Sequence, residues 1–417
     1  MKKNSEINGF KETEIGLIPS DWEVVNIDSF VKFQRGSEPG RSNYNKEMKG
    51  VRFLRVVDVS GSREDEIYTT VENIRFCTEK DILITLDGSP GIIRKGLSGA
   101  YSSGIRKIVF TNKDLNQDYT YFVLQNDFVK KIIEKYTTGI TIKHSSKAIP
   151  YIKIPLPSLP EQQKIAVVLL KIQQAIEQQE KIIQTTKELK KSLTNKFFTE
   201  GLHGEEQKKT EIGLIPKSWE VKKLGDIALI ERGKFTHRPR NEPKFYGGKI
   251  PFIQTGDIAN SDGRITSYTQ TLNELGLSIS KIFPKGTIVI TIAANIGDTA
   301  ILTFDSAFPD SIIGITPHDN VLNIYLEYYL RTQKDKMNMM APRGTQKNIN
   351  IQFLKPWFVP IAPKNEQNEI ANTLSSIDKK LSQAESRKQT LQSLFKTMLN
   401  QLMTGRVRIK DLDIKVN

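Results

Sequence analysis

The segment 160–172, P-E-Q-Q-K-I-A-V-V-L-L-K-I, decides the fold, because the chain carries a second version of it. The pattern returns 205 residues later as N-E-Q-N-E-I-A-N-T-L-S-S-I at 365–377. The same offset holds without a gap from 139–199 onto 344–404. A repeat of this length is the first feature to explain, since overlooking it misassigns the whole fold. The sequence therefore predicts a duplicated unit.

Each copy is predicted to form one long helix, because apolar residues recur at alternating steps of four and three, as in a coiled coil. The first copy is the more polar one in its second half. A helix over 161–199 would be about 58 Å long, and a one-sided apolar stripe of that length needs a partner. Two unrelated amphipathic helices are the alternative, but the shared offset favours an antiparallel pair within the chain. The residues expected to pack between the helices are Ile165, Leu169, Ile172, Ile176 and Ile183, with Ile370, Leu374, Ile377, Leu381, Leu391 and Phe395.

Length and charge limit the possible classes of protein. A chain of 417 residues exceeds one hydrophobic core, so at least two domains are expected. The formal net charge of +14 favours a polyanionic partner, although a soluble basic protein from a lysine-rich genome would also carry such a charge. The single cysteine, Cys77, excludes an internal disulfide framework and fits a reducing compartment. With no signal peptide at 1–10 and no apolar run of membrane-spanning length, we expect a cytoplasmic protein without a membrane partner.

A second repeat marks where each unit begins. T-E-I-G-L-I-P-S-D-W-E-V at 13–24 returns as T-E-I-G-L-I-P-K-S-W-E-V at 210–221, with the tryptophans expected to anchor a turn in a core. Short β-prone runs joined by turns follow, then helices near 120–134 and 322–333. The predicted fold class is α+β: two mixed α/β domains separated by two long antiparallel coiled-coil helices, in a pseudo-two-fold internal repeat. The predicted segments are a domain at 1–155, a helix at 156–203, a domain at 204–360, a helix at 361–405 and a tail at 406–417 without assigned function.

These segments together resemble the specificity (S) subunit of type I restriction-modification systems. The resemblance rests on I-G-x-I-P-x-x-W-E at 15–23 and 212–220, and on P-x-P-S-L-P-E-Q-Q-K-I-A at 155–166. It also rests on I-P-F-I-Q-T-G-D-I at 250–258 and K-T-M-L-N-Q-L-M-T-G at 396–405. It covers nearly the whole chain, in the family's order of target-recognition domain and helix, twice. The ending of the first helix departs from the pattern.

The resemblance implies a non-catalytic DNA-specificity subunit. Each recognition domain would read one half of a bipartite target in double-stranded DNA, and the helical pair would set the spacing. Two modification subunits, which methylate adenine with S-adenosylmethionine, would dock on the chain, joined by restriction subunits with ATP- and Mg-dependent translocase and nuclease activity. The chain itself would bind no cofactor.

The residues themselves point to recognition and not to chemistry. No glycine-rich cofactor loop, no Asn-Pro-Pro-aromatic motif and no phosphate loop is present in the sequence. The four histidines lack metal-ligand spacing with Cys77, so no metal site is expected. A scaffold whose two domains bind proteins is the main alternative, and a methyltransferase or nuclease acting alone is a remote one.

DNA contacts are expected from basic and amide side chains in the loops of the two domains, since Lys and Arg neutralise phosphates while Arg, Asn and Gln read base edges. Three loop regions supply candidates: two occur in both copies, and the third, with Arg94, Lys95 and Arg106, occurs in the first copy only. In the first domain these are Arg35, Arg41, Asn43, Tyr44, Arg94, Lys95, Arg106, Lys143 and Lys147. In the second they are Arg232, Lys234, Arg238, Arg240, Asn241, Arg343, Gln346 and Lys347.

Overall fold

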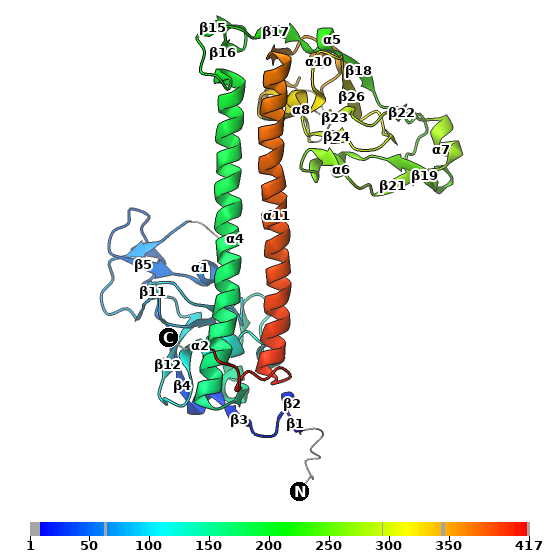
Figure 1. Cartoon of the computed structure of the whole chain (residues 1–417). Coiled ribbons are helices and arrows are strands. Elements are labelled where there is room, and N and C mark those ends of the chain that lie inside the picture. Colours follow the sequence, from blue (N-terminus) through cyan, green and yellow to red (C-terminus); the bar gives the residue numbers. More distant parts are fainter. Residues whose placement is uncertain (1–8, 62–64, 294, 343–346, 415–417) are drawn as a thin grey trace. The chain divides into compact units, whose positions relative to one another are not determined.

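The computed structural model describes residues 9–61, 65–293, 295–342 and 347–414 (Figure 1). Contacts divide the chain into two compact units: unit 1 is Met1–Glu180 with Arg387–Asn417, and unit 2 is Lys181–Ser386. Each unit combines one mixed domain with a part of both long helices, α4 (Leu159–Glu200) and α11 (Lys364–Met403). The predicted α+β class with a duplicated organisation is confirmed. Among the described residues, no helix has the length and apolar character needed to cross a membrane.

Unit 1 begins with two short hairpin strands and continues through a mixed domain. Its strands are β1 (Phe10–Thr13), β2 (Gly16–Pro19), β3 (Glu23–Asn26), β4 (Val31–Arg35), β5 (Val51–Leu54), β6 (Tyr68–Thr69), β7 (Phe76–Cys77), β8 (Leu83–Thr85), β9 (Asp87–Gly88), β10 (Ile93–Arg94), β11 (Gly99–Tyr101), β12 (Ile105–Phe110), β13 (Lys143–His144) and β14 (Lys153–Leu156). Its helices are η1 (Ile27–Ser29), η2 (Arg41–Asn43), α1 (Val56–Ser60), α2 (Gln117–Val123), α3 (Asp127–Lys135) and η3 (Ser146–Tyr151).

Unit 2 repeats this order after the end of α4. Its strands are β15 (Gln207–Thr210), β16 (Gly213–Pro216), β17 (Glu220–Lys223), β18 (Ala228–Arg232), β19 (Tyr246–Phe252), β20 (Arg264–Ile265), β21 (Gln270–Leu272), β22 (Ile282–Phe283), β23 (Ile288–Thr291), β24 (Thr299–Leu302), β25 (Ser306–Ala307), β26 (Ile312–Pro317) and β27 (Phe358–Ile361). Its helices are α5 (Leu224–Ile227), η4 (Pro243–Phe245), α6 (Thr255–Ala259), α7 (Glu274–Ser278), α8 (Asn323–Thr332), α9 (Lys334–Met340) and α10 (Ile351–Leu354).

The two domains share most of their sheet topology although their sequences diverge, and unit 2 adds β20 as a fifth strand parallel to β24. In unit 1 the sheets run β10-β8-β12-β4 and β6-β5-β11-β7, and in unit 2 they run β18-β26-β23-β24-β20 and β21-β19-β25-β22. In each second sheet one inner pair is parallel, β11 with β5 and β25 with β19, and the other pairs are antiparallel. The same fold is therefore present twice, with different loops.

One local prediction was wrong. The helix expected near 120–134 is two helices, α2 and α3. The side-chain oxygen of Asn126 accepts a hydrogen bond from the backbone N–H of Phe128. Asparagine favours this capping position because its side chain satisfies a free backbone donor at a helix start. The cap begins a new helix at a point where the apolar pattern alone continues.

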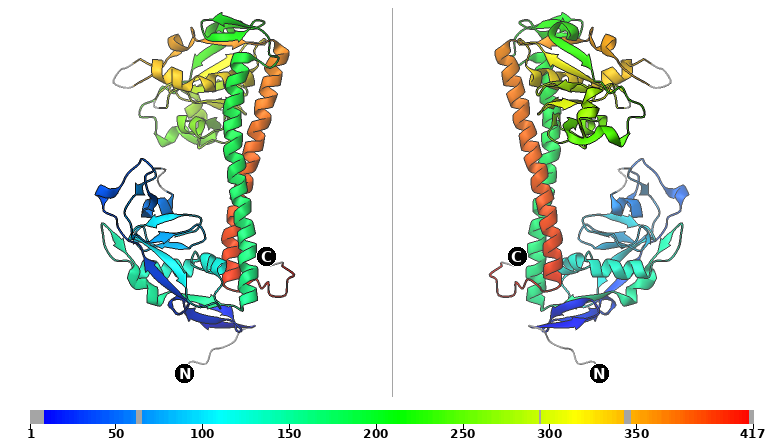
Figure 2. Two further views of the ribbon diagram at one scale, coloured as in Figure 1. Left: turned by 90° about the vertical axis from the view of Figure 1, so that its left-hand side faces the viewer. Right: turned by 90° about the vertical axis from the view of Figure 1, so that its right-hand side faces the viewer.

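Within each unit the two long helices run antiparallel. In unit 2, Lys187 pairs with Glu385 (2.9 Å), and Lys190 pairs with Asp378, further back along α11. In unit 1, Lys388 pairs with Glu180 (2.9 Å). Figure 2 shows α4 and α11 side by side within each unit. The helices lie inside the predicted segments 156–203 and 361–405 and stop a few residues short of them at each end.

The apolar residues that were predicted to pack between the long helices, here called the ladder, are shielded from solvent. Ile165, Leu169, Ile370 and Leu374 are buried in the cores at the helix ends, and the other ladder residues are buried to an intermediate degree. Positions between them are mostly exposed, as the four-three spacing requires.

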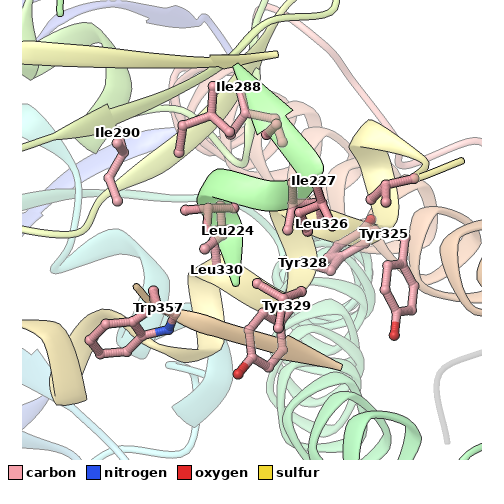
Figure 3. Packing of buried hydrophobic residues seen from close by; sticks show 14 of the residues in the cluster. Leu224, Ile227, Ile288, Ile290, Tyr325, Leu326, Tyr328, Tyr329, Leu330 and Trp357 are labelled. Carbon is pink, nitrogen blue, oxygen red and sulfur yellow. The ribbon is translucent and has the colours of Figure 1, made fainter. Parts of the chain in front are cut away.

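The main core of unit 2 lies where α8 meets the first sheet, α5 and the long helices. Figure 3 shows Leu326 and Leu330 of α8 near Leu224 and Ile227 of α5. Phe198 of α4 packs against Tyr325, with ring centroids 5.1 Å apart. Unit 1 has a corresponding core that includes Leu169 of α4 and Leu402 of α11. Each domain is thus joined to the helices by an apolar contact at one helix end.

Both predicted tryptophan anchors are buried, Trp22 at 1% and Trp219 at 0% exposure. Each packs near a left-handed glycine that ends a long helix. A Cβ on Gly405 would lie 2.2 Å from Pro19, and one on Gly201 would lie 2.9 Å from Pro216. The irregular exit of the first helix therefore makes the same close approach as the regular one.

Candidate nucleic-acid interface

Arg35 and Arg232 occupy equivalent places, at the ends of β4 and β18. The Nε of Arg35 donates to the carbonyl oxygen of Ser103 (3.3 Å), and the Nε of Arg232 donates to that of Asp310 (2.6 Å). In each unit this bond ties the end of one strand to the turn before its neighbour, β12 or β26. Both side chains thus have a structural bond in addition to any contact with DNA.

The loop after β18 concentrates positive charge around one carboxylate. Arg238 donates to Asp310 through Nη2 (2.9 Å), and Arg240 pairs with the other oxygen of the same carboxylate. Lys234 and Asn241 of this loop are exposed. Two guanidiniums on one carboxylate leave a net positive charge, and the geometry holds both at one place. Asp310 was not foreseen from the sequence.

The corresponding loop in unit 1 is ordered by other bonds. The amide nitrogen of Asn43 donates to the carbonyl oxygen of Pro39 (2.6 Å), and the hydroxyl of Tyr44 donates to Glu38 (3.3 Å). Burial, followed by the Glu38 carboxylate, raises the pKa of Tyr44. Arg41 is exposed on the short helix η2. The loop therefore offers one positive side chain beside an amide and a phenol.

The third predicted region is divided between surface and interior. Arg94 is exposed and Lys95 pairs with Asp118. Arg106 is only 5% exposed, and its Nη2 donates to Asp87 (3.3 Å) and to Ser146 (2.8 Å). Burial lowers the pKa of Arg106, and the Asp87 carboxylate opposes that shift. Arg106 is a buried structural cation in unit 1, which argues against its predicted contact with DNA.

The loop before α4 places a basic hairpin on the surface of unit 1. Lys143 lies on β13, which pairs with β9, and Lys147 follows it; both are exposed. His144 contacts Asp87, with Nδ1 and Oδ1 2.8 Å apart. In unit 2, Lys347 is exposed and its Nζ donates to the carbonyl oxygen of Asn338 (3.4 Å). Arg343 and Gln346 lie outside the described residues.

A repeated Glu-Gln pair, which the sequence marked only as identical, fixes each domain to its helix. Gln162 accepts the backbone N–H of Asn116 and Gln367 accepts that of Leu322, both at 2.8 Å. Both glutamines are 1% exposed. A buried amide that satisfies backbone groups holds their geometry, because leaving them unpaired costs about 1–3 kcal/mol each. The 205-residue identity could have identified this clamp.

The described residues contain no cluster of three or more His, Cys, Asp or Glu side chains that could hold a metal ion. The loops described above carry basic side chains, held in place by carboxylates and backbone bonds. Such loops can contact phosphates and base edges.

Comparison with known proteins assigns the fold a family. The family model for the type I restriction modification DNA specificity domain matches residues 19–187 and 216–393. The type I restriction enzyme MjaVIII specificity subunit of Methanocaldococcus jannaschii is 30% identical over 97% of this chain and 97% of its own length. The EcoBI specificity subunit of Escherichia coli is 23% identical over 95% and 89%.

Solved structures show the same fold. The S subunit of a type I restriction-modification system from M. genitalium aligns with a TM-score of 0.62 at 17% identity, over 92% of this chain and 96% of that one. A structure from a study of type I complex assembly aligns with a TM-score of 0.55 at 18% identity, over 94% and 99%. With two copies of the family's domain over most of its length, this chain belongs to the type I restriction-modification DNA specificity family.

Proposed function

We propose that this chain is the DNA-reading subunit of a type I restriction-modification complex and performs no catalysis. Each mixed domain would read one half of a bipartite target in double-stranded DNA, and α4 with α11 would set the distance between halves. The chain would carry two adenine-methylating modification subunits and restriction subunits in the cytoplasm, with S-adenosylmethionine, ATP and Mg bound by those partners. This role extends the family assignment to bases, spacing and partners.

One observation carries the proposal. The two units share most of their sheet topology and the Glu-Gln clamp, whereas the loops after β4 and β18 differ in their charged and polar side chains. A common frame with unlike loops suits two readers of unrelated sequences. Because phosphate contacts are similar on any duplex, the difference between the loops is where base discrimination would arise.

Mapping methylated adenines tests the proposal directly. The chain is co-expressed with its modification partner in a host without adenine methylation, and N6-methyladenine is located across the genome. We expect two short unlike sequences separated by a fixed number of unspecified base pairs. A continuous motif, or two identical halves in inverted orientation, would contradict the proposal. Arg238→Ala should relax the motif in one half only, and a base contact of this kind is worth about 1–3 kcal/mol.

The spacing role can be tested with paired insertions. Seven residues inserted both within 176–183 of α4 and within 381–388 of α11 preserve the ladder and add about 10 Å. At about 3.4 Å per base pair, the gap between halves should grow by about three base pairs while each half stays the same. The matched control carries the insertion in α4 alone, which puts the two ladders out of step. An unchanged gap with the paired insertion would refute the spacing role.

A further inference from the structure

The two domains contact the long helices at a second place, and the chemistry of that second contact differs between units. Tyr119 of α2 and Tyr325 of α8 mark equivalent positions, since their hydroxyls donate to the carbonyl oxygens of Pro155 (2.8 Å) and Pro360 (2.9 Å). Three residues further along each helix stand Phe122 and Tyr328.

In unit 1 the second contact is aromatic. Phe122 faces Phe395 of α11, with ring centroids 5.9 Å apart. Phe122 is fully buried, and Phe395 packs against the same core. An apolar contact of this kind is not weakened by salt, because it contains no charge for ions to screen.

In unit 2 one of the equivalent positions carries a charge and the other a hydroxyl. The residue 205 positions before Phe395 is Lys190 of α4, which pairs with Asp378 of α11. The hydroxyl of Tyr328 donates to the same carboxylate at 2.7 Å, and Lys190 Nζ lies 5.6 Å from the centre of the Tyr328 ring. Three residues on three helices thus form one contact, here called the ionic clasp: Lys190, Tyr328 and Asp378.

The domain side of the ionic clasp is held rigidly. Arg264 and Arg331 also lie over the Tyr328 ring, at 5.8 and 5.5 Å. Both pair with Glu327, which is fully buried, and Arg331 does so through two nitrogens at 2.9 and 2.6 Å. A cation over an aromatic face and a fully paired buried carboxylate both restrict side-chain motion. Tyr328 is therefore presented to the helices in one orientation.

The helix side of the ionic clasp is within reach of solvent. Lys190 and Asp378 line a cavity of about 550 Å³, with Asp257, Asp262 and Ser382 among its other residues. Their side chains retain 19% and 22% exposure. Ions can enter such a space, so this contact should weaken in high salt while the aromatic contact of unit 1 should not.

We propose that Lys190 and Asp378 are positioning residues, which fix the angle of the second recognition domain on the helical pair through Tyr328. The apolar joint at Phe198 and the Gln367 clamp both attach the domain near one end of the helical pair, and a domain attached only at one end can rotate. Lys190 lies eight residues from Phe198, about 12 Å along α4, so the ionic clasp supplies the second point. Interfaces between domains of one chain permit relative motion by default, which gives a second point its value. For DNA reading, this rests on the proposed function.

The test measures geometry without DNA. Nitroxide labels on Lys249→Cys and Thr373→Cys report the domain against α11 in unit 2, and labels on Lys80→Cys and Ser393→Cys report unit 1. We expect one narrow distance for each pair in 0.1 M NaCl. Lys190→Met, or 1 M NaCl on the otherwise unchanged chain, should broaden the unit 2 distribution at least twofold and leave unit 1 unchanged. Lys190→Glu with Asp378→Lys should restore the narrow distribution.

An unchanged unit 2 distribution in both Lys190→Met and 1 M NaCl would overturn the proposal. Equal broadening in both units would also overturn it, since that indicates general loosening. In the methylation assay, Lys190→Met should relax only one half of the target, and the charge-reversed pair should recover it. Because the label distances need no DNA, a methylation pattern that refutes the proposed function leaves the geometric result intact.

Discussion

In unit 1 the indole N–H of Trp22 donates to Glu161 (3.1 Å), and in unit 2 that of Trp219 donates to Glu366 (2.8 Å). The two carboxylates differ in the other hydrogen bonds that they accept. Glu366 accepts the backbone N–H of Leu202 (2.8 Å), where the chain leaves α4. Glu161 instead accepts from Arg408 of the tail, through Nε (2.9 Å) and Nη2 (3.0 Å).

This difference follows from chain connectivity. Unit 2 receives its covering segment from the continuous chain between α4 and β15, whereas unit 1 is covered by the chain's C-terminal tail. Arg408 also pairs with Asp21 through two bonds of 2.8 Å and lies 5.4 Å from the centre of the Trp22 ring. The tail, to which the sequence assigned no function, therefore completes unit 1 with an ionic contact that unit 2 does not need.

Removing either tryptophan should have the largest effect and should show whether the units unfold separately. Trp22→Ala and Trp219→Ala each create a buried cavity and leave a buried carboxylate oxygen without its donor, at a cost of about 3–5 kcal/mol. Each change should raise hydrogen exchange in its own unit, because the cores contain residues of one unit only. Trp→Phe at each site is the milder control. Equal loss of protection in both units would refute separate cores.

Arg408→Ala should destabilise unit 1 alone, by about 1–3 kcal/mol, since it removes hydrogen bonds between charged groups. Lys410→Ala is the matched control: its Nζ lies 3.9 Å from Asp21 and is half exposed, so it should cost less than about 0.5 kcal/mol. Denaturant unfolding with exchange measurements on each unit distinguishes the two. A uniform loss over both units would contradict a role confined to unit 1.

The same contact should make the stability of unit 1 depend on pH in the acid range. The hydrogen bond from Arg408 lowers the pKa of Asp21 below its usual 3.8. A carboxyl with a depressed pKa in the folded state stabilises above the unfolded pKa, and the contribution is lost as pH falls through the folded one. Below about pH 4, the stability difference between the original chain and Arg408→Ala should therefore shrink. A constant difference down to about pH 2 would exclude the Asp21 contribution.

Asp310→Asn should change DNA binding more modestly. Asp310 neutralises part of the charge of Arg238 and Arg240. At the comparable loop of unit 1, Glu38 instead accepts hydrogen bonds from the Tyr44 hydroxyl and from the backbone N–H of Ser103. Removing the carboxylate charge should raise affinity for unrelated duplex by roughly three- to tenfold at low salt and steepen the salt dependence by about one ion. Asp310→Glu retains the charge and serves as control. Unchanged affinity would remove this loop from the interface.

The features that occur in both copies could be predicted from the sequence, whereas the contacts that occur in only one copy could not. The 205-residue offset predicted both helices and their ladder because coiled-coil packing is periodic, and periodicity is visible in one dimension. The pairing of Arg106 with Asp87 or of Arg238 with Asp310 depends on which loops meet, and no spacing in the sequence encodes that. For the same reason, the sequence showed only that the second half of the first helix is the more polar one, and the contact of Lys190 with Tyr328 and Asp378 gives one of its polar residues a role.

Cys77 lies in unit 1, and the labelling rate of its thiol should report the opening of that unit without any further substitution. It is fully buried, and desolvation raises the pKa of its thiol to about 11. Since the thiolate is the reactive form, about one thiol in a thousand would be ionised at pH 8 even before burial slows access. Labelling by a thiol reagent should therefore require opening of unit 1. Trp22→Ala and Arg408→Ala should accelerate it in that order, and Trp219→Ala should leave the rate unchanged. Acceleration by Trp219→Ala would show that the two units open together, despite their separate cores.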